Sequence, residues 1–314
     1  MIHLVTGGAG FIGHNIVKKL EFAYENCVIV DNFTDYNILK KEEIKFLKKE
    51  RKKKYLSQIV NIDIRNREAL ENIFKTTKIH SVIHLASFPR QKIVNTDPVV
   101  ASEVMITSLI HLLELSKKYG VSKFTYISSS MVYGDFVNNI KEDYDCKPKG
   151  QYGIMKLAGE KLVQDYSSHF NYTIIRPSAV YGEYDVNDRV ISKFFYSAMK
   201  NEIINVNGPN EILDFTHVND TADGITKAIL SNNSVNQIYN ITRSTDNPKT
   251  LLNAAELVIK IVGKGKLKIN DRDKDFPKRG ILNIQKAREQ LNYNPKIDIE
   301  EGFTRYYDWL QNTI

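Results

Sequence analysis

Three residues in the middle of the chain have side chains suited to moving a proton and a hydride. Tyr152 and Lys156 lie four apart in QYGIMKLAGEKL, so a helix would place the phenol and the ammonium on one face. We expect the positive charge to lower the pKa of the phenol. Tyr152 could then take a proton from a substrate hydroxyl while hydride leaves the same carbon for a nicotinamide. Ser129 would hydrogen-bond the reacting oxygen, and Lys156 would also hold the ribose of the cofactor.

The position of Tyr152 in the chain matters more than its spacing from Lys156. The same spacing recurs at Tyr36/Lys40, Tyr119/Lys123 and Tyr196/Lys200. Tyr152, however, lies on a helix predicted over 151–169, and a serine cluster comes just before that helix, at the carboxyl end of the strand predicted over 123–128. Open α/β sheets bind their ligands at that edge. We therefore favour Ser129 as the third member of the site, with Ser128 and Ser130 as alternatives.

A glycine-rich turn near the N-terminus has the form of a dinucleotide-binding loop. The sequence IHLVTGGAGFIGHNIVKKL places Gly7, Gly10 and Gly13 between a predicted strand, 2–6, and a predicted helix, 11–24. Glycines let the backbone turn sharply and approach a pyrophosphate, while the free amides at the positive end of the helix offset its charge.

Acidic residues follow the next two strands. Asp31 ends the run VIVDN, where a carboxylate can accept hydrogen bonds from the adenosine ribose and repel a 2′-phosphate, which favours NAD over NADP. Asp63 in NIDIRN could meet the adenine, or could cap the helix that follows it. The predicted NAD contacts are Gly7, Gly10, Phe11, Ile12, Gly13, Asp31, Asn32, Asp63, Ile64, Leu85, Ala86, Ser87, Tyr152 and Lys156.

Strand and helix patterns alternate along the first part of the chain. Runs rich in Val, Ile and Tyr predict strands at 2–6, 27–31, 58–62, 81–85, 123–128 and 172–176. Amphipathic stretches predict helices at 11–24, 66–77, 98–119 and 151–169. This alternation predicts an α/β fold with a doubly wound parallel sheet, the Rossmann architecture.

The strict alternation fades after Pro177. The later part of the chain is predicted to hold a helix at 188–200, strands at 203–206 and 237–241, a helix at 219–231 and a helical tail. We therefore predict a smaller α/β lobe for the substrate. The expected NAD-binding domain is 1–176, with 214–242 returning to it, and the expected substrate lobe is 177–213 and 243–314.

Composition indicates a soluble globular protein, since 42% of the 314 residues are hydrophobic and 26% are charged. No apolar run approaches the roughly 20 residues of a membrane helix, and the first residues read as a strand rather than a signal peptide. We expect a cytoplasmic protein without a membrane partner. Cys27 and Cys146 are far apart and lack ligand spacing, so no disulfide framework and no metal site are expected.

Positive charge is concentrated in residues 40–54, which hold nine Lys or Arg against three Glu, whereas the whole chain carries a formal +7. Ile44, Leu47 and Tyr55 recur at roughly helical spacing, which favours a solvated amphipathic helix over a contact with phosphate or membrane. The rest of the chain is nearly neutral. We do not expect it to bind nucleic acid.

Several motifs in order resemble the extended short-chain dehydrogenases/reductases of the NAD-dependent epimerase/dehydratase group. They are TGGAGFIG, VDN, DIR, HLA, SSSMVYG, YxxxK, the pair Arg176/Pro177, DFTHVND and FPKRG. The resemblance runs through nearly the whole chain. It implies a Rossmann domain with a nucleotide-sugar-binding lobe, a role in carbohydrate metabolism such as polysaccharide biosynthesis, and a homodimer formed through helices like 98–119 and 151–169.

Two departures from the group narrow the implied reaction. Related dehydratases and decarboxylases carry an acid where this chain has Met131, and dehydratases have an Asp where it has Ser130. A thioether cannot move a proton, so the resemblance favours a nucleotide-sugar 4-epimerase that oxidises C4, lets the ketone rotate and returns the hydride. The alternatives are a 4-dehydrogenase or 4-ketoreductase, a dehydratase with an acid from elsewhere in the chain, and a non-catalytic dinucleotide sensor.

The resemblance also bears on the nucleotide-diphosphate sugar. Many relatives have Arg at the position of Leu213 and Asn at that of Ala179, and both usually help to hold the substrate. Arg279 matches a phosphate-binding arginine, for which a surface ion pair is the alternative. Arg189 is balanced between a substrate contact and a helix-surface charge. The predicted substrate contacts are Ser130, Arg90, Arg189 and Arg279.

Overall fold

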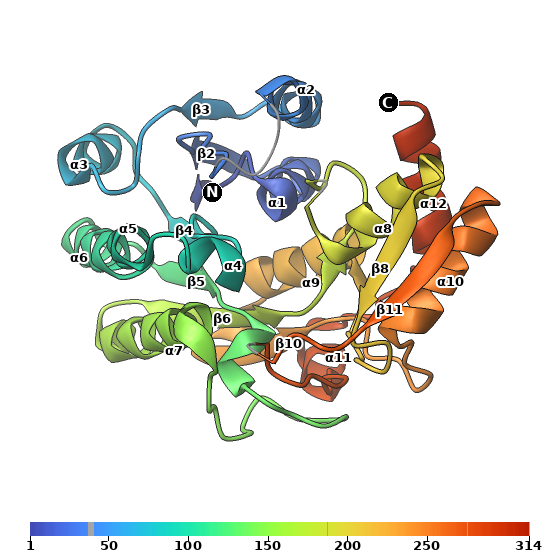
Figure 1. Ribbon diagram of the computed structural model, residues 1–314. Coiled ribbons are helices and arrows are strands. Elements are labelled where there is room, and N and C mark those ends of the chain that lie inside the picture. Colours follow the sequence, from blue (N-terminus) through green and yellow to red (C-terminus); the bar gives the residue numbers. More distant parts are fainter. Residues whose placement is uncertain (37–40, 187, 275, 314) are drawn as a thin grey trace.

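Parallel strands form the central sheet of the protein in this computed structural model, which describes residues 1–36, 41–186, 188–274 and 276–313 (Figure 1). Within these residues the sheet has seven strands in the order β10-β6-β5-β4-β1-β2-β3, and each pairing is parallel. Their bounds are β1 (Ile2–Thr6), β2 (Asn26–Val30), β3 (Gln58–Val60), β4 (Ser81–His84), β5 (Lys123–Ile127), β6 (Asn171–Pro177) and β10 (Gln237–Ile241). The doubly wound parallel sheet predicted from the sequence is confirmed.

Helices cover both faces of this sheet (Figure 1). On one side lie α1 (Phe11–Phe22), α2 (Lys41–Lys52), α9 (Val218–Leu230) and α11 (Gln285–Leu291); on the other lie α3 (Arg67–Thr76), α5 (Pro98–Ser102), α6 (Ser108–Lys118) and α7 (Gly150–Asp165). Successive strand residues point to opposite faces. Leu4 therefore joins the core that contains Leu109 of α6, whereas Val5 joins the core that contains Ile16 of α1.

The helical stretch Pro98–Lys118 is long and apolar enough to cross a membrane by length and composition, which corrects the expectation that no such segment exists. A π-helical turn, Glu103–Thr107, joins α5 to α6 within it. Leu109, Leu112 and Leu113 are buried in the core against the sheet. The apolar side chains thus serve to pack the helix on β4 and β5.

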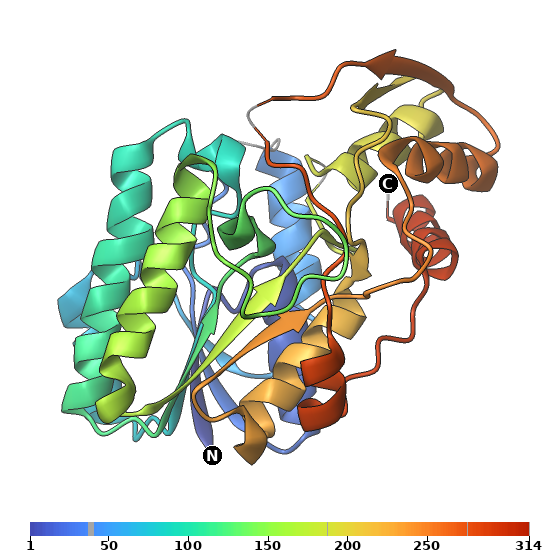
Figure 2. The same ribbon diagram turned by 90° about the horizontal axis from the view of Figure 1, so that it is seen from below.

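A second group of elements lies beside the carboxyl end of the sheet, away from the N-terminus (Figure 2). It comprises α8 (Val190–Met199), β8 (Ile203–Asn207), α10 (Leu251–Val262), β11 (Lys266–Asn270) and α12 (Ile299–Gln311). Aromatic and aliphatic side chains such as Phe195, Val258 and Phe303 form its own core. The helical tail predicted for this region is wrong in part, because β11 pairs in parallel with β8.

Short elements complete the chain. They are α4 (Gln91–Val94), the paired strands β7 (Val180–Tyr181) and β9 (Thr216–His217), and the 3-10 turns Ser130–Tyr133, Tyr166–Ser168 and Asn232–Ser234. Later segments also return to the central sheet, since β10 pairs with β6 and α9 packs against α1. The domain boundaries at 176, 213 and 242 stay a prediction.

The buried side chain of His84, in the middle of the sheet, should make the stability of the protein depend on pH. The ring is buried, its Nδ1 lies 2.7 Å from the Thr6 hydroxyl, and burial lowers its pKa to about 3, helped by the charge of Lys156. The unfolded chain binds a proton at His84 below about pH 6.5, whereas the folded chain does not do so until about pH 3. The free energy of unfolding should therefore fall as the pH drops through this window.

The variant His84→Gln tests this expectation, because it keeps a polar group beside Thr6 and removes the titration. Urea unfolding between pH 6 and 4 should show a shallower pH dependence for the variant, by at most about 1.4 kcal/mol per pH unit. Equal slopes for the two proteins would show that His84 does not titrate in this way.

Candidate functional site

A cavity of about 1240 Å³ is lined by residues of the sheet edge and of the second group of elements. Every residue that the sequence analysis predicts to contact cofactor or substrate lines it, from the glycine turn to Arg279. Residues that lie far apart in the chain are thus brought together at the carboxyl edge of the parallel strands, where open α/β sheets bind ligands. The individual roles of these residues stay predictions.

The glycine turn between β1 and α1 leaves no room for side chains. Gly7 has φ of +70°, and a Cβ there would lie 2.7 Å from the backbone nitrogen of Ala86. A Cβ on Gly13 would lie 2.3 Å from the Gly7 carbonyl oxygen. Gly10 starts α1 without a side-chain cap, so an anion can accept hydrogen bonds from the first amides of the helix. The turn fits a pyrophosphate.

Asp31 is held in place just after β2. One carboxylate oxygen accepts a hydrogen bond from the Ala9 amide at 3.0 Å, and the other accepts one from the Phe33 amide at 2.8 Å. Burial raises the pKa of Asp31 above its ordinary value, while these bonds and the charges of Arg51 and Lys48 oppose the rise. Because Ala9 belongs to the glycine turn, the carboxylate is fixed beside the place where a dinucleotide would lie.

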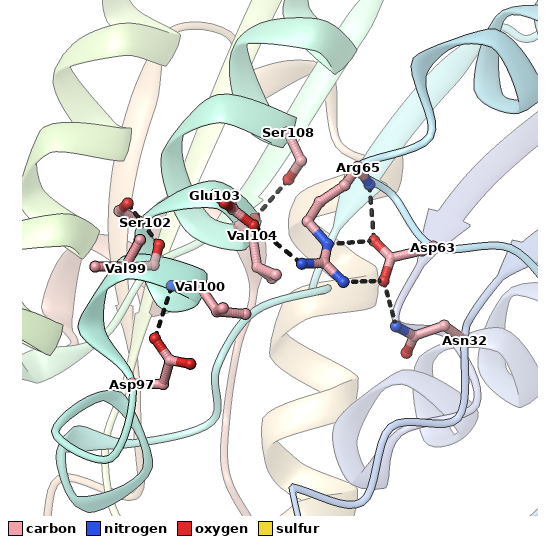
Figure 3. A network of polar contacts seen from close by, with 10 residues as sticks. All are labelled: Asn32, Asp63, Arg65, Asp97, Val99, Val100, Ser102, Glu103, Val104 and Ser108. Carbon is pink, nitrogen blue, oxygen red and sulfur yellow. Dashed lines mark hydrogen bonds and ion pairs between the residues drawn. The ribbon is translucent and has the colours of Figure 1, made fainter.

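Asp63 belongs to a polar network at the same end of the cavity (Figure 3). Asn32 donates to Asp63 at 2.9 Å, and Arg65 pairs with Asp63 at 2.9 Å and with Glu103 at 3.0 Å. The hydrogen bonds from Arg65 lower the pKa of Asp63. The helix-cap alternative does not hold, because Asn66 caps α3 instead. Asp63 is therefore ionised at neutral pH, is hydrogen-bonded on both oxygens and lines the cavity.

Burial raises the pKa of Tyr152, while hydrogen bonding with the Ser129 side chain and the charge of Arg189 act in the opposite direction. The lowered pKa that the sequence predicts for this phenol is therefore wrong in the structure. The lysine Nζ donates to the Ile127 carbonyl at 2.8 Å and lies 5.9 Å from the centre of the Tyr152 ring. Burial also lowers the pKa of Lys156 to about 7, against the charge of Glu160.

The three neighbouring serines have different partners. Ser128 donates to the Glu160 carboxylate at 2.5 Å, and Ser130 donates to the Ser178 hydroxyl at 3.1 Å. Ser129 accepts a bond from the Met131 amide at 3.2 Å and reaches Tyr152. The geometry therefore favours Ser129 as the partner of the tyrosine.

Charged residues also line the cavity. Arg189 pairs with the buried Asp185 at 3.1 Å, and Arg90 pairs with Asp188. Burial lowers the pKa of Arg279 to about 10, so its guanidinium stays charged at neutral pH. Arg279 faces the cavity, and Arg189 is paired within its wall.

Three residues at which the sequence departs from the family pattern that it resembles also line the cavity: Met131, Ala179 and Leu213. Met131 is buried in the apolar cluster that includes Tyr152 and Phe88. Ala179, with φ of +39°, and Leu213 line the cavity as well. These side chains present apolar surface to the cavity.

Arg51 is a cavity residue that was not predicted from the sequence. Ile44, Leu47 and Tyr55 are buried, as the predicted amphipathic helix requires, but Arg51 is only 9% exposed and lines the cavity. Its spacing from Leu47 and Tyr55 places it on the buried face, which is the signal that could have identified it. Lys40, the first residue of the basic segment, lies outside the described residues.

A doubly wound sheet with a glycine turn before its first helix and a tyrosine in the same cavity is typical of enzymes that use a dinucleotide for hydride transfer. The chain belongs to the NAD-dependent epimerase/dehydratase family, whose pattern matches residues 3–242. It is an enzyme of this family, and its cofactor is NAD.

Individual relatives match along almost the whole chain. A UDP-glucuronate 4-epimerase of Thermodesulfobacterium geofontis is 31% identical, over 99% of this chain and 97% of its own. The crystal structure of a UDP-glucuronic acid 4-epimerase from Bacillus cereus superposes with a TM-score of 0.90 at 26% identity, covering 100% of both chains. A UDP-glucose 4-epimerase from Thermotoga maritima gives 0.87 at 27% identity, covering 100% of this chain and 99% of its own.

Proposed function

We propose that the protein is an NAD-dependent nucleotide-sugar 4-epimerase in which Tyr152 is the acid and base. The observation that carries this proposal is that Tyr152 and Ser129 line the same cavity as the glycine turn. The relatives named above support a 4-epimerase. The homodimer and the cytoplasmic location expected from the sequence stay predictions.

The proposed reaction needs one proton and one hydride to leave C4 and return. Bound NAD supplies a positively charged hydride acceptor that can give the hydride back. Tyr152 takes the proton of the C4 hydroxyl and later returns it to the same oxygen, which Ser129 holds by a hydrogen bond. Between these steps the 4-keto sugar rotates and presents its other face to the bound cofactor. The returned hydride then inverts C4.

The raised pKa of Tyr152 sets a requirement for this role. A buried phenol is protonated at neutral pH, so it can act as a base only where positive charge favours its phenolate. Arg189 is one such cation, and Lys156, with a pKa of about 7, can add a second when it is protonated. We propose that Lys156 also holds the cofactor ribose.

The surroundings of Tyr152 favour C4 chemistry over elimination of water. Met131 packs against the tyrosine and has no proton to give, while the Ser130 hydroxyl is engaged with Ser178. Loss of water from a 4-keto sugar needs an acid and a base for the proton at C5. Neither of the two positions where related dehydratases carry these groups has one.

UDP-glucuronate is the first substrate to test. Arg90 and Arg189 are cationic residues of the cavity, and Arg279 is a third, which suits a substrate with a diphosphate and a sugar carboxylate. Two of the relatives named above are UDP-glucuronate 4-epimerases.

Isotope labelling in deuterated water distinguishes the candidate reactions. We expect the purified protein, given a panel of UDP-, GDP- and dTDP-sugars that includes UDP-glucuronate, to invert C4 without solvent deuterium and without net NADH. NMR and mass spectrometry of the products provide the measurement. Deuterium at C5 or C6, together with loss of water, would overturn the proposal in favour of a dehydratase. Net NADH would indicate a 4-dehydrogenase.

A further inference from the structure

Residues 182–186, here called the strap, follow β7 and run along the cavity beside the glycine turn. Asp185 and Val186 line the cavity together with Gly10 and Phe11. Tyr184 has φ of +68°, a left-handed conformation that is costly for an aromatic residue and persists only when contacts hold it. Contacts with neighbouring elements must therefore hold the strap in this conformation.

The side chain of Tyr184 packs among three helical segments. Its ring meets His14 of α1 edge-on at 5.6 Å between centroids and Trp309 of α12 at 5.1 Å. The Lys54 ammonium, just after α2, lies 5.0 Å from the ring centre. These contacts place the strap over the first turn of α1.

Arg51 fastens the backbone of the strap. Its Nη2 and Nε donate to the Tyr184 carbonyl at 2.7 Å and 3.2 Å. Burial lowers the pKa of Arg51 to about 10, while the charges of Asp185 and Asp31 oppose this, so the guanidinium is charged at neutral pH. One buried cation thus holds the strap through the Tyr184 carbonyl and lies in the electrostatic field of both Asp185 and Asp31.

The strap also places a second guanidinium. Asp185 is buried and pairs with Arg189 at 3.1 Å. The Arg189 guanidinium lies 5.9 Å from the centre of the Phe11 ring, and Phe11 is the first residue of α1. Positive charge on the strap side therefore faces the helix end that suits a pyrophosphate.

We propose that Arg51 is a positioning residue that fastens the strap across the cofactor site and thereby keeps NAD bound between turnovers. The inference rests on the proposed function, because an epimerase must keep its cofactor while hydride leaves and returns, whereas a dehydrogenase exchanges it. Arg51 acts through the Tyr184 carbonyl and Arg189.

Release of NAD in the absence of sugar tests the proposal. Holoenzyme is dialysed, and the NAD that remains is measured by chromatography after acid denaturation. Arg51→Met should release NAD about tenfold faster or more, because it removes two charge-assisted hydrogen bonds. Arg51→Lys should release NAD at a rate between those of Arg51→Met and the unaltered protein. Lys52→Met is the matched control, since it removes the same charge from an exposed position on the same helix and should release NAD at the parental rate.

Thermal melting and a second variant complete this test. Melting in saturating NAD should differ little between Arg51→Met and Lys52→Met if Arg51 acts on retention rather than on folding. If Arg51→Met does not fold, Tyr184→Leu provides a second variant, which removes the ring contacts and should also speed release. The proposal would be overturned if the variant that folds released NAD as slowly as the unaltered protein. It would also be overturned if the unaltered protein itself lost NAD rapidly. Because no sugar is present, a negative result here can be distinguished from a failure of the proposed 4-epimerase reaction, which the isotope experiment tests.

Discussion

Tyr152→Phe is expected to lower turnover by about 10²- to 10⁴-fold while NAD stays bound. The substitution removes only the hydroxyl that exchanges a proton with C4, and the ring keeps its place in the apolar cluster with Met131 and Phe88. Inversion at C4 should be followed by NMR, and bound NAD by chromatography of the denatured protein. A large loss of turnover at constant NAD content would place the phenol in the chemical step.

Tyr119→Phe is the matched control for this experiment. Tyr119 also has a lysine four residues later, but its hydroxyl bonds to Glu71 at 2.9 Å and does not line the cavity. This variant should turn over at the parental rate. Undiminished turnover in Tyr152→Phe, or an equal loss in both variants, would contradict the assignment of Tyr152.

The glycine turn could be predicted from the sequence because its geometry is local. Gly7, Gly10 and Gly13 lie within one strand-turn-helix unit, so the requirement for small residues is contained in a few consecutive positions. The sheet was also predictable, since each buried parallel strand is a short apolar run. Among the strands of this sheet the bounds differ most at β3, which ends at Val60 rather than at residue 62, and the helix predicted over 151–169 ends earlier, at Asp165.

The ionisation of the site could not be predicted from spacing. Four residues between Tyr152 and Lys156 place both side chains on one helix face, but the ammonium donates to a carbonyl of β5 and burial raises the pKa of the phenol. Burial depends on which strands and loops cover the helix, and these come from distant parts of the chain. A local pattern contains no such information.

The second group of elements illustrates a signal that was present but not used. In β11 the residues Lys266, Leu267, Lys268 and Ile269 alternate polar and apolar, which is the period of a strand. Its parallel partner β8 lies about 60 residues earlier, so only the tertiary fold shows that the two pair. Arg51 is comparable, since its helical spacing was visible while its target, the Tyr184 carbonyl, was not.

A buried ion pair beneath the serine cluster was not predicted either. The Arg176 and Glu160 side chains are 3% and 1% exposed and pair at 2.6 Å. Glu160 also accepts from Ser128, and Arg176 also donates to the Tyr133 hydroxyl and to the Glu142 carbonyl. Arg176 was noted only as part of a family motif. The network fixes Ser128, the residue next to Ser129, and so supports the position of the hydroxyl proposed to bind the reacting oxygen.

Arg176→Met is expected to destabilise the protein by about 3–5 kcal/mol, because it leaves the Glu160 carboxylate buried without its cation. Urea unfolding of the holoenzyme at pH 7 gives the free energy. Lys260→Met provides the comparison, since the Lys260–Glu300 pair is 72% and 63% exposed and its loss should cost less than about 1 kcal/mol. The double variant Arg176→Met, Glu160→Leu should recover part of the loss, because it removes the unpaired charge as well. Equal effects of Arg176→Met and Lys260→Met would show that the buried pair does not hold the serine cluster in place.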